Sequence, residues 1–188
     1  MKGVSSMKIK SLLCAALLAL ILLPAALCAA EISDEDMALG GIHIGDTRAA
    51  VEELYGGGNR YADGVSVWNG EDVGIHFIDY GASLLVTYRS TERGWHVTAV
   101  RLGMDNGMNK YRSKPSEASQ SFTTPRGIHL GSTADDLEAA YGCLPKPKCS
   151  HNVPPVCGYF YEGETAQIAF YICDEHSPGI RFIWLHEK

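Results

Sequence analysis

Hydrophobic positions have helical spacing in two short stretches of the chain, and the longer stretches that follow them alternate as strands do. Both short stretches carry apolar side chains at i, i+3 and i+4, which lie on one side of a helix. These residues are Val51, Leu54 and Tyr55 in the first stretch and Leu137, Ala140 and Tyr141 in the second. The spacing predicts two short helices, each with one buried stripe.

Threonine and glycine mark both ends of the two predicted helices. Thr47 and Thr133 stand at the starts, where a hydroxyl oxygen accepts from the free N–H groups of the first turn. Gly56 and Gly142 stand at the ends, where glycine suits the left-handed residue that terminates a helix. These positions set the expected helix boundaries.

Alternating segments after each helix predict antiparallel strands. They cover residues 65–68, 73–78, 83–89 and 95–102 after the first helix, and 156–161, 166–173 and 180–186 after the second. Asn69 and Gly70 tolerate positive φ and favour a tight hairpin between the first two strands. The expected fold class is α+β, with a short helix packed on a three- or four-stranded antiparallel sheet, twice in tandem.

An internal similarity supports this plan. Residues 41–56 align without a gap on residues 127–142, and eight of the sixteen positions are identical. We therefore expect one repeat over residues 31–102 and a second over residues 126–188. Residues 103–125, rich in Asn, Ser, Lys, Pro and Thr, are expected to form the connecting loop.

The last predicted strand is apolar on both sides, unlike its counterpart in the first repeat. Ile180, Phe182 and Trp184 would lie toward the helix, which leaves Ile183 and Leu185 on the other face. A strand with two apolar faces is covered on both. We expect its second face to pack on the other repeat, with a partner protein as the alternative.

The duplicated segment, Gly-Ile-x-(Ile/Leu)-Gly-x-Thr-x-x-x-(Val/Leu)-x-x-x-Tyr-Gly, resembles the module of the β-lactamase inhibitory proteins and the outer-membrane assembly lipoproteins. The same module occurs in many uncharacterised secreted bacterial proteins. In the inhibitors, two modules lie side by side and grip another protein, whereas the assembly lipoprotein is a single-module partner subunit. The resemblance implies a binding protein that is not an enzyme.

Only the turn-and-helix positions carry over from that resemblance, and they serve folding. They are Gly45, Thr47, Tyr55, Gly131, Thr133 and Tyr141. No binding residue transfers. The sequence also departs from the pattern, because its lipidation signal is poor and its last four cysteines all fall in the second repeat.

The first thirty residues have the features of a secretory signal peptide. Three lysines precede an uncharged apolar run, which Pro24 interrupts before the small residues Ala29 and Ala30. The run is shorter than the roughly 20 apolar residues that a membrane span needs. We expect export to the periplasm or the medium, with lipidation of Cys28 as a minor alternative because bulky Leu27 precedes it.

The composition and the net charge of the chain limit the kinds of partner that it can bind. The 188 residues are 46% hydrophobic and 20% charged, which is typical of a globular protein. The formal net charge of −6 becomes −9 once residues 1–30 and their three lysines are removed. Nucleic acid and anionic membranes are poor partners for such a field.

Four cysteines remain after the leader: Cys143, Cys149, Cys157 and Cys173. An even number in an exported chain predicts two disulfides, and no C-x-x-C pair favours a metal. If residues 162–165 form a hairpin turn, Cys157 lies opposite Phe170, too far from Cys173 for a bridge. This disfavours Cys157–Cys173 and leaves the other two connectivities open.

Catalytic and cofactor motifs are missing from the sequence, which has no G-x-S-x-G, H-E-x-x-H, G-x-x-x-x-G-K-[ST] or G-x-G-x-x-G. His43 and His129 have no further ligand at metal spacing, so we expect them to face solvent. Residues 34–36 lack the glycine and closing glutamate of a calcium loop and are expected to form a solvated tail. We therefore assign no catalytic residue, cofactor or metal.

The function expected from the sequence is that of an exported, non-enzymatic module that binds another exported or envelope protein. The candidate contacts are Arg89, His96, Tyr171, Arg181 and Ile183, because strand phase directs them away from the helices. The alternatives are a structural subunit of a cell-envelope assembly and an enzyme with an unfamiliar site.

Overall fold

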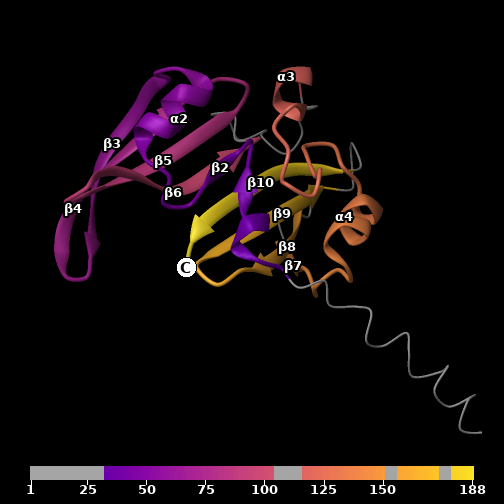
Figure 1. Cartoon of the computed structure of the whole chain (residues 1–188). Coiled ribbons are helices and arrows are strands. Elements are labelled where there is room, and N and C mark those ends of the chain that lie inside the picture. Colours follow the sequence, from indigo (N-terminus) through magenta and orange to yellow (C-terminus); the bar gives the residue numbers. More distant parts are fainter. Residues whose placement is uncertain (1–31, 104–115, 151–155, 174–178) are drawn as a thin grey trace, which may run out of the picture. The chain divides into compact units, whose positions relative to one another are not determined.

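The computed structural model describes residues 32–103, 116–150, 156–173 and 179–188 (Figure 1). The predicted signal peptide and much of the predicted connecting loop lie outside these ranges. Within them, every helix is too short or too polar to cross a membrane.

Eight strands form one antiparallel sheet in the order β3-β4-β5-β6-β10-β9-β8-β7 (Figure 1). Their bounds are β3 Asn59–Trp68, β4 Glu71–Asp79, β5 Leu84–Thr91, β6 Gly94–Leu102, β7 Lys148–Cys149, β8 Val156–Glu162, β9 Ala166–Cys173 and β10 Ile180–Glu187. A separate two-stranded sheet pairs β1 (Ala38–Leu39) with β2 (Ile42–His43). Most predicted strands lie where the alternation placed them, although β3 starts earlier.

The predicted fold class, two helix-on-sheet repeats, is wrong. β6 and β10 are hydrogen-bonded neighbours, with Leu102 opposite Ile183 and Val100 opposite Leu185. This pairing joins the strands after the first helix to those after the second in one continuous, mostly β architecture. The halves thus meet edge to edge through the backbone of β6 and β10, whereas the sequence analysis expected the second face of the last strand to pack on the other repeat.

The helices are short. They are the 3-10 turn η1 (Asp34–Asp36), α2 (Arg48–Tyr55), α3 (Glu117–Gln120) and α4 (Ala134–Tyr141). Thr47 and Thr133 accept hydrogen bonds from the amides of Ala50 and Asp136, as the sequence predicts. The prediction that residues 103–125 form only a connecting loop is wrong at α3, which lies inside that segment.

The turns before α2 and α4 dock on the central strands in the same way. The amide of Gly45 donates to the carbonyl of Val97 in β6, and the amide of Gly131 donates to the carbonyl of Ile180 in β10, each at 2.8 Å. The return bonds, from Val97 to Asp46 and from Ile180 to Ser132, are also 2.8 Å. The duplicated segments therefore anchor their helices to the strands that join the sheet.

One hydrophobic core lies between the sheet and the helices. Val51 of α2 and Leu137 of α4 are fully buried in the same cluster as Val86, Phe170 and Leu185 of the sheet. Leu54 was predicted to be buried but is 56% exposed, so the buried side of α2 consists of Val51 and, in part, Tyr55.

Residues 34–36 are not the solvated tail that the sequence suggested. Asp34 accepts hydrogen bonds from the amide of Glu164, at 2.7 Å, and the hydroxyl of Thr165, at 2.6 Å, at the turn between β8 and β9. Both bonds favour the ionised carboxylate, so they lower the pKa of Asp34. The acidic segment thus fixes η1 against the second half of the sheet.

Candidate binding surface

The sheet has a second face, turned away from Val51 and Leu137, which we call the opposite face. Arg101 and Trp184 face each other on it, across the central pair of strands β6 and β10. Directly paired residues point to the same side of a sheet. The registers place further side chains beside these two on the same face: Phe77, Leu85, Thr87, Ala99, Phe160, Ala169, Tyr171, Phe182 and His186.

Arg101 is a partly buried cation at the centre of this face. Its guanidinium carbon lies 5.4 Å from the ring centroid of Trp184, and among the described residues no carboxylate forms an ion pair with it. Burial lowers the pKa of Arg101 because it penalises the charged form. A desolvated guanidinium with an aromatic neighbour and no counter-ion suits a ligand that brings a carboxylate.

Two buried polar atoms near Arg101 also lack hydrogen-bond partners within the described ranges. They are the indole nitrogen of Trp184 and the hydroxyl oxygen of Thr87. Buried polar groups are normally satisfied, and one left unpaired carries a free-energy penalty of about 1–3 kcal/mol. Polar donors and acceptors are thus concentrated where β5, β6 and β10 run side by side.

Arg89 and His96, two predicted contacts, lie opposite each other on β5 and β6. Arg89 forms a two-pronged ion pair with Glu187 at the end of β10, and its guanidinium carbon lies 3.7 Å from the ring centroid of Trp68. The imidazole Nδ1 of His96 lies 2.9 Å from the carbonyl oxygen of Gly45. Arg89 and His96 are therefore held in place by this chain's own groups.

Tyr171, the third predicted contact, belongs to an aromatic group on the second half of the sheet. Its ring centroid lies 5.2 Å from that of Phe182 and 5.9 Å from that of Phe160. Lys148 of β7 places its ammonium group 4.6 Å from the centroid of Phe160. Tyrosine is among the side chains that supply much of the binding energy in protein interfaces.

Arg181 and Ile183, the remaining predicted contacts, are 2% and 0% exposed. Ile183 lies on the helix-covered face, opposite Leu102 and Phe170 of the core. The predicted phase of the last strand is thus wrong, because an irregularity between Ile180 and Phe182 shifts the register. The sequence analysis missed Arg101 and Trp184 for the same reason. Each follows a register shift, in the pairing of β6 with β5 and of β10 with β9, that reverses the face on which its side chain lies.

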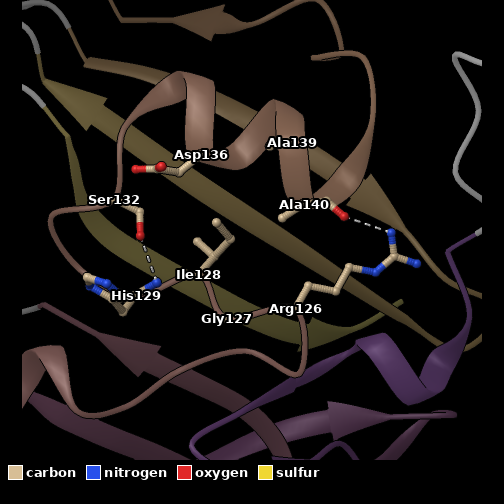
Figure 2. Close-up of a pocket in the computed structure, with 8 residues that line it drawn as sticks. All are labelled: Arg126, Gly127, Ile128, His129, Ser132, Asp136, Ala139 and Ala140. Atoms are coloured by element: carbon tan, nitrogen blue, oxygen red, sulfur yellow. Dashed lines mark hydrogen bonds between the residues drawn. The ribbon is translucent and has the colours of Figure 1, made fainter.

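A shallow pocket of about 430 Å³ lies on the other side of the molecule, between α4 and the turn that precedes it (Figure 2). His129 and Ser132 line it, but the His129 amide donates to the Ser132 hydroxyl at 3.2 Å. Arg126 donates to the Ala140 carbonyl oxygen at 3.1 Å, and the Asp136 carboxylate accepts from the hydroxyl of Thr133, the N-cap of α4, at 2.8 Å. Because these polar groups hold the turn and the helix together, the opposite face is the stronger candidate.

No group of three or more His, Cys, Asp or Glu residues in the described part of the chain could hold a metal ion. His43 is exposed beside Asp46, with its Nδ1 3.7 Å from the carboxylate. This pair joins neighbouring residues of one turn and supplies only two metal ligands.

Cys149 and Cys157 form a disulfide, with their Cα atoms 4.0 Å apart across β7 and β8. Cys143 is disulfide-bonded as well, and the side chain of Cys173 lies outside the described set. The predicted register is off by two residues, since Cys157 lies opposite Ile172 and Cys173 opposite Val156. The bridge ties β7, the last strand at this edge of the sheet, to β8.

Comparison with solved structures finds a distant likeness to the crystal structure of a DUF4309 family protein, YjgB, from Bacillus subtilis subsp. subtilis strain 168. The two are 15% identical, the match covers 79% of this chain and 83% of that chain, and the TM-score is 0.38. The sequence matches no family model and no curated protein.

Proposed function

We propose that this chain is an exported, non-enzymatic binding protein that holds another protein on the opposite face of its sheet. Arg101 is the observation that carries the proposal. It is a partly buried cation without an ion-pair partner among the described residues, and it lies beside Trp184 at the junction of β6 and β10. A carboxylate from a partner would pair with the guanidinium and offset its desolvation.

The surroundings of Arg101 support a macromolecular partner. The opposite face extends from Phe77 on β4 to Phe160 on β8, so a partner could contact side chains on six neighbouring strands. Aromatic and arginine side chains are enriched at the energetic centres of protein interfaces. An inhibitor or an envelope partner protein fits this kind of surface.

The disulfide supports the expected compartment. Disulfides form and persist in oxidising environments outside the cytosol. The bridge between Cys149 and Cys157 therefore agrees with export, which the leader-like residues 1–30 predict. We propose the periplasm or the medium as the place of action.

Site-specific photo-cross-linking tests the proposal. A photoreactive residue at His186, half-buried on the opposite face, should capture one protein from envelope or culture-fluid extracts. The same residue at Leu54, which is 56% exposed on α2, should not capture that protein. Equal capture from both positions would contradict the proposal.

A matched pair of arginine variants tests the role of Arg101. Arg101→Gln removes the central cation, whereas Arg93→Gln removes an exposed one at the turn between β5 and β6. We expect Arg101→Gln to weaken binding of the captured protein by tenfold or more, as is typical of interface hot spots, and Arg93→Gln to leave it unchanged. The proposal fails if Arg101→Gln binds normally, or if only a small molecule raises the melting temperature.

A further inference from the structure

The two edges of the large sheet are protected very differently (Figure 1). β7 closes one edge with two residues, one of which is tied to β8 by a disulfide. β3 forms the other edge with ten residues, all of them exposed. Natural proteins usually blunt a long edge with lysine, proline or a covering element, and β3 contains neither lysine nor proline.

β3 also exposes hydrophobic side chains. Val65 is 72% exposed, Val67 is 67% exposed and Trp68 is 40% exposed. Val65 lies opposite Gly74 of β4, which has no side chain to cover it. Among the described strands only β4 pairs with β3, so the outer backbone groups of β3 can bond to another extended strand.

We infer that β3 pairs antiparallel with β3 of a second copy of this chain, about a two-fold axis at Val65. The strand is regular from Ala62 to Trp68, because its one irregularity lies between Arg60 and Ala62. Val65 is the midpoint of this regular segment. Pairing the whole segment with itself places Val65 against Val65 of the second copy and buries the most exposed hydrophobic side chain of the edge.

The charges fit this register. In the paired edge, Val67 lies opposite Asp63 of the second copy. Because of the bulge, Arg60 takes the next pairing position after Ala62, beside the hairpin turn that precedes Glu71 and Asp72 of the second copy. Within its own chain the Arg60 guanidinium donates to Asp63 at 2.6 Å, and its remaining N–H groups can approach this acidic turn. The two-fold axis repeats this contact, so each arginine approaches the acidic hairpin tip of the other copy.

Cysteine cross-linking tests the register directly. Opposed residues of an antiparallel pair have Cα atoms about 4.5–5.5 Å apart, within the range that a disulfide spans. Val65→Cys should therefore form a disulfide-linked dimer on mild oxidation, measured as intact mass without reductant. Val67→Cys is the matched control, because it is similarly exposed but lies about 13 Å from its symmetry mate.

Lysine variants test the same axis without oxidation. Val65→Lys places two like charges on the axis and should raise the dimer Kd by about tenfold or more. Val67→Lys faces Asp63 of the second copy and should leave the Kd unchanged or lower. The full sequence is expressed with its leader, and the exported protein is purified with its disulfides oxidised. Analytical ultracentrifugation then measures the dimer Kd of both variants, and circular dichroism checks that each variant folds.

Three outcomes would overturn the inference: a wild-type protein that stays monomeric at every concentration, equal cross-linking at positions 65 and 67, or equal effects of the two lysines. A monomer that binds an extended peptide along β3 would assign the edge to a different partner. The test does not involve Arg101, so its failure is distinguishable from failure of the proposed binding function.

Discussion

Asp36 and Arg126, ninety residues apart in sequence, form a two-pronged ion pair with N–O distances of 2.7 and 2.8 Å. Asp36 belongs to η1, and Arg126 stands in the turn that leads to α4. The guanidinium also lies over the ring of Tyr141, 5.1 Å from its centroid. One arginine therefore joins η1 to α4.

This ion pair predicts a pH dependence of stability. The hydrogen bonds from Arg126 hold the pKa of Asp36 at about 2, below its ordinary value of 3.8. A carboxyl group with a lowered folded-state pKa stabilises the protein above its unfolded pKa, and that stabilisation is lost as the pH falls through the folded pKa. We expect wild type to lose this contribution between about pH 4 and pH 2.

Asp36→Asn isolates that contribution. It leaves a partly buried guanidinium without its anion and should lower the free energy of unfolding by about 1–3 kcal/mol at neutral pH. The difference from wild type should shrink toward pH 2, which urea denaturation at several pH values measures. Glu35→Gln is the control, since Glu35 is exposed, and its stability should match wild type throughout.

Gly103, just after β6, predicts a strong effect of a single methyl group. Its φ is +91°, and an added Cβ would lie 2.3 Å from the backbone carbonyl oxygen of Arg181. Gly103→Ala therefore combines left-handed strain with a clash against rigid backbone. We expect the free energy of unfolding to fall by about 3 kcal/mol or more.

Gly81→Ala separates these two causes. Gly81 has a similar φ of +82°, but no atom lies within 4 Å of an added Cβ. This variant should lose only about 1 kcal/mol, from strain alone. If thermal unfolding shows equal losses at both positions, the close approach of Gly103 to the backbone of Arg181 is contradicted.

The disulfide predicts both a mass change and a stability change. Reduction should add four protons to the intact mass if two bridges are present, and peptide mapping should recover a fragment that links Cys149 to Cys157. Replacing both residues by serine should destabilise the protein by about 2 kcal/mol, the loop entropy of a short bridge. An unchanged melting temperature would show that this bridge contributes nothing to the stability of the folded state.

Two leucines predict different results, although the sequence analysis expected both side chains to be covered. Leu185 is fully buried beneath the helices at the junction with β6, whereas Leu54 is 56% exposed. Leu185→Ala should lower the free energy of unfolding by about 3 kcal/mol, and Leu54→Ala should change it by less than about 0.5 kcal/mol. Chemical denaturation of the two variants measures the difference.

Local chemistry made much of the secondary structure predictable. The threonine caps, the glycines after α2 and α4, and the Asn69–Gly70 turn depend on backbone preferences that act over a few residues. Both Asn69 and Gly70 have positive φ, at 51° and 85°. Alternation also placed the strands, because neighbouring residues of a strand face opposite sides.

Distant pairing could not be predicted in the same way. The edge-to-edge contact of β6 and β10 brings together residues far apart in sequence, and either strand could satisfy its backbone with another neighbour. The irregularity between Ile180 and Phe182 reverses which side chains of β10 face the core, and no residue type at that point in the sequence predicts it. The central pair of the candidate surface, Arg101 and Trp184, therefore emerged only from the observed register.

The junction of β6 and β10 also affects how the chain reaches its folded state. β6 can complete its hydrogen bonds only after β10 has formed, and contacts between such distant segments make folding slow. Until then β6 and β10 each have an unpaired edge, and the β6 edge of one molecule can pair with β10 of another. Refolding at high protein concentration should therefore produce exchanged oligomers, in which β10 of one molecule completes β6 of its neighbour.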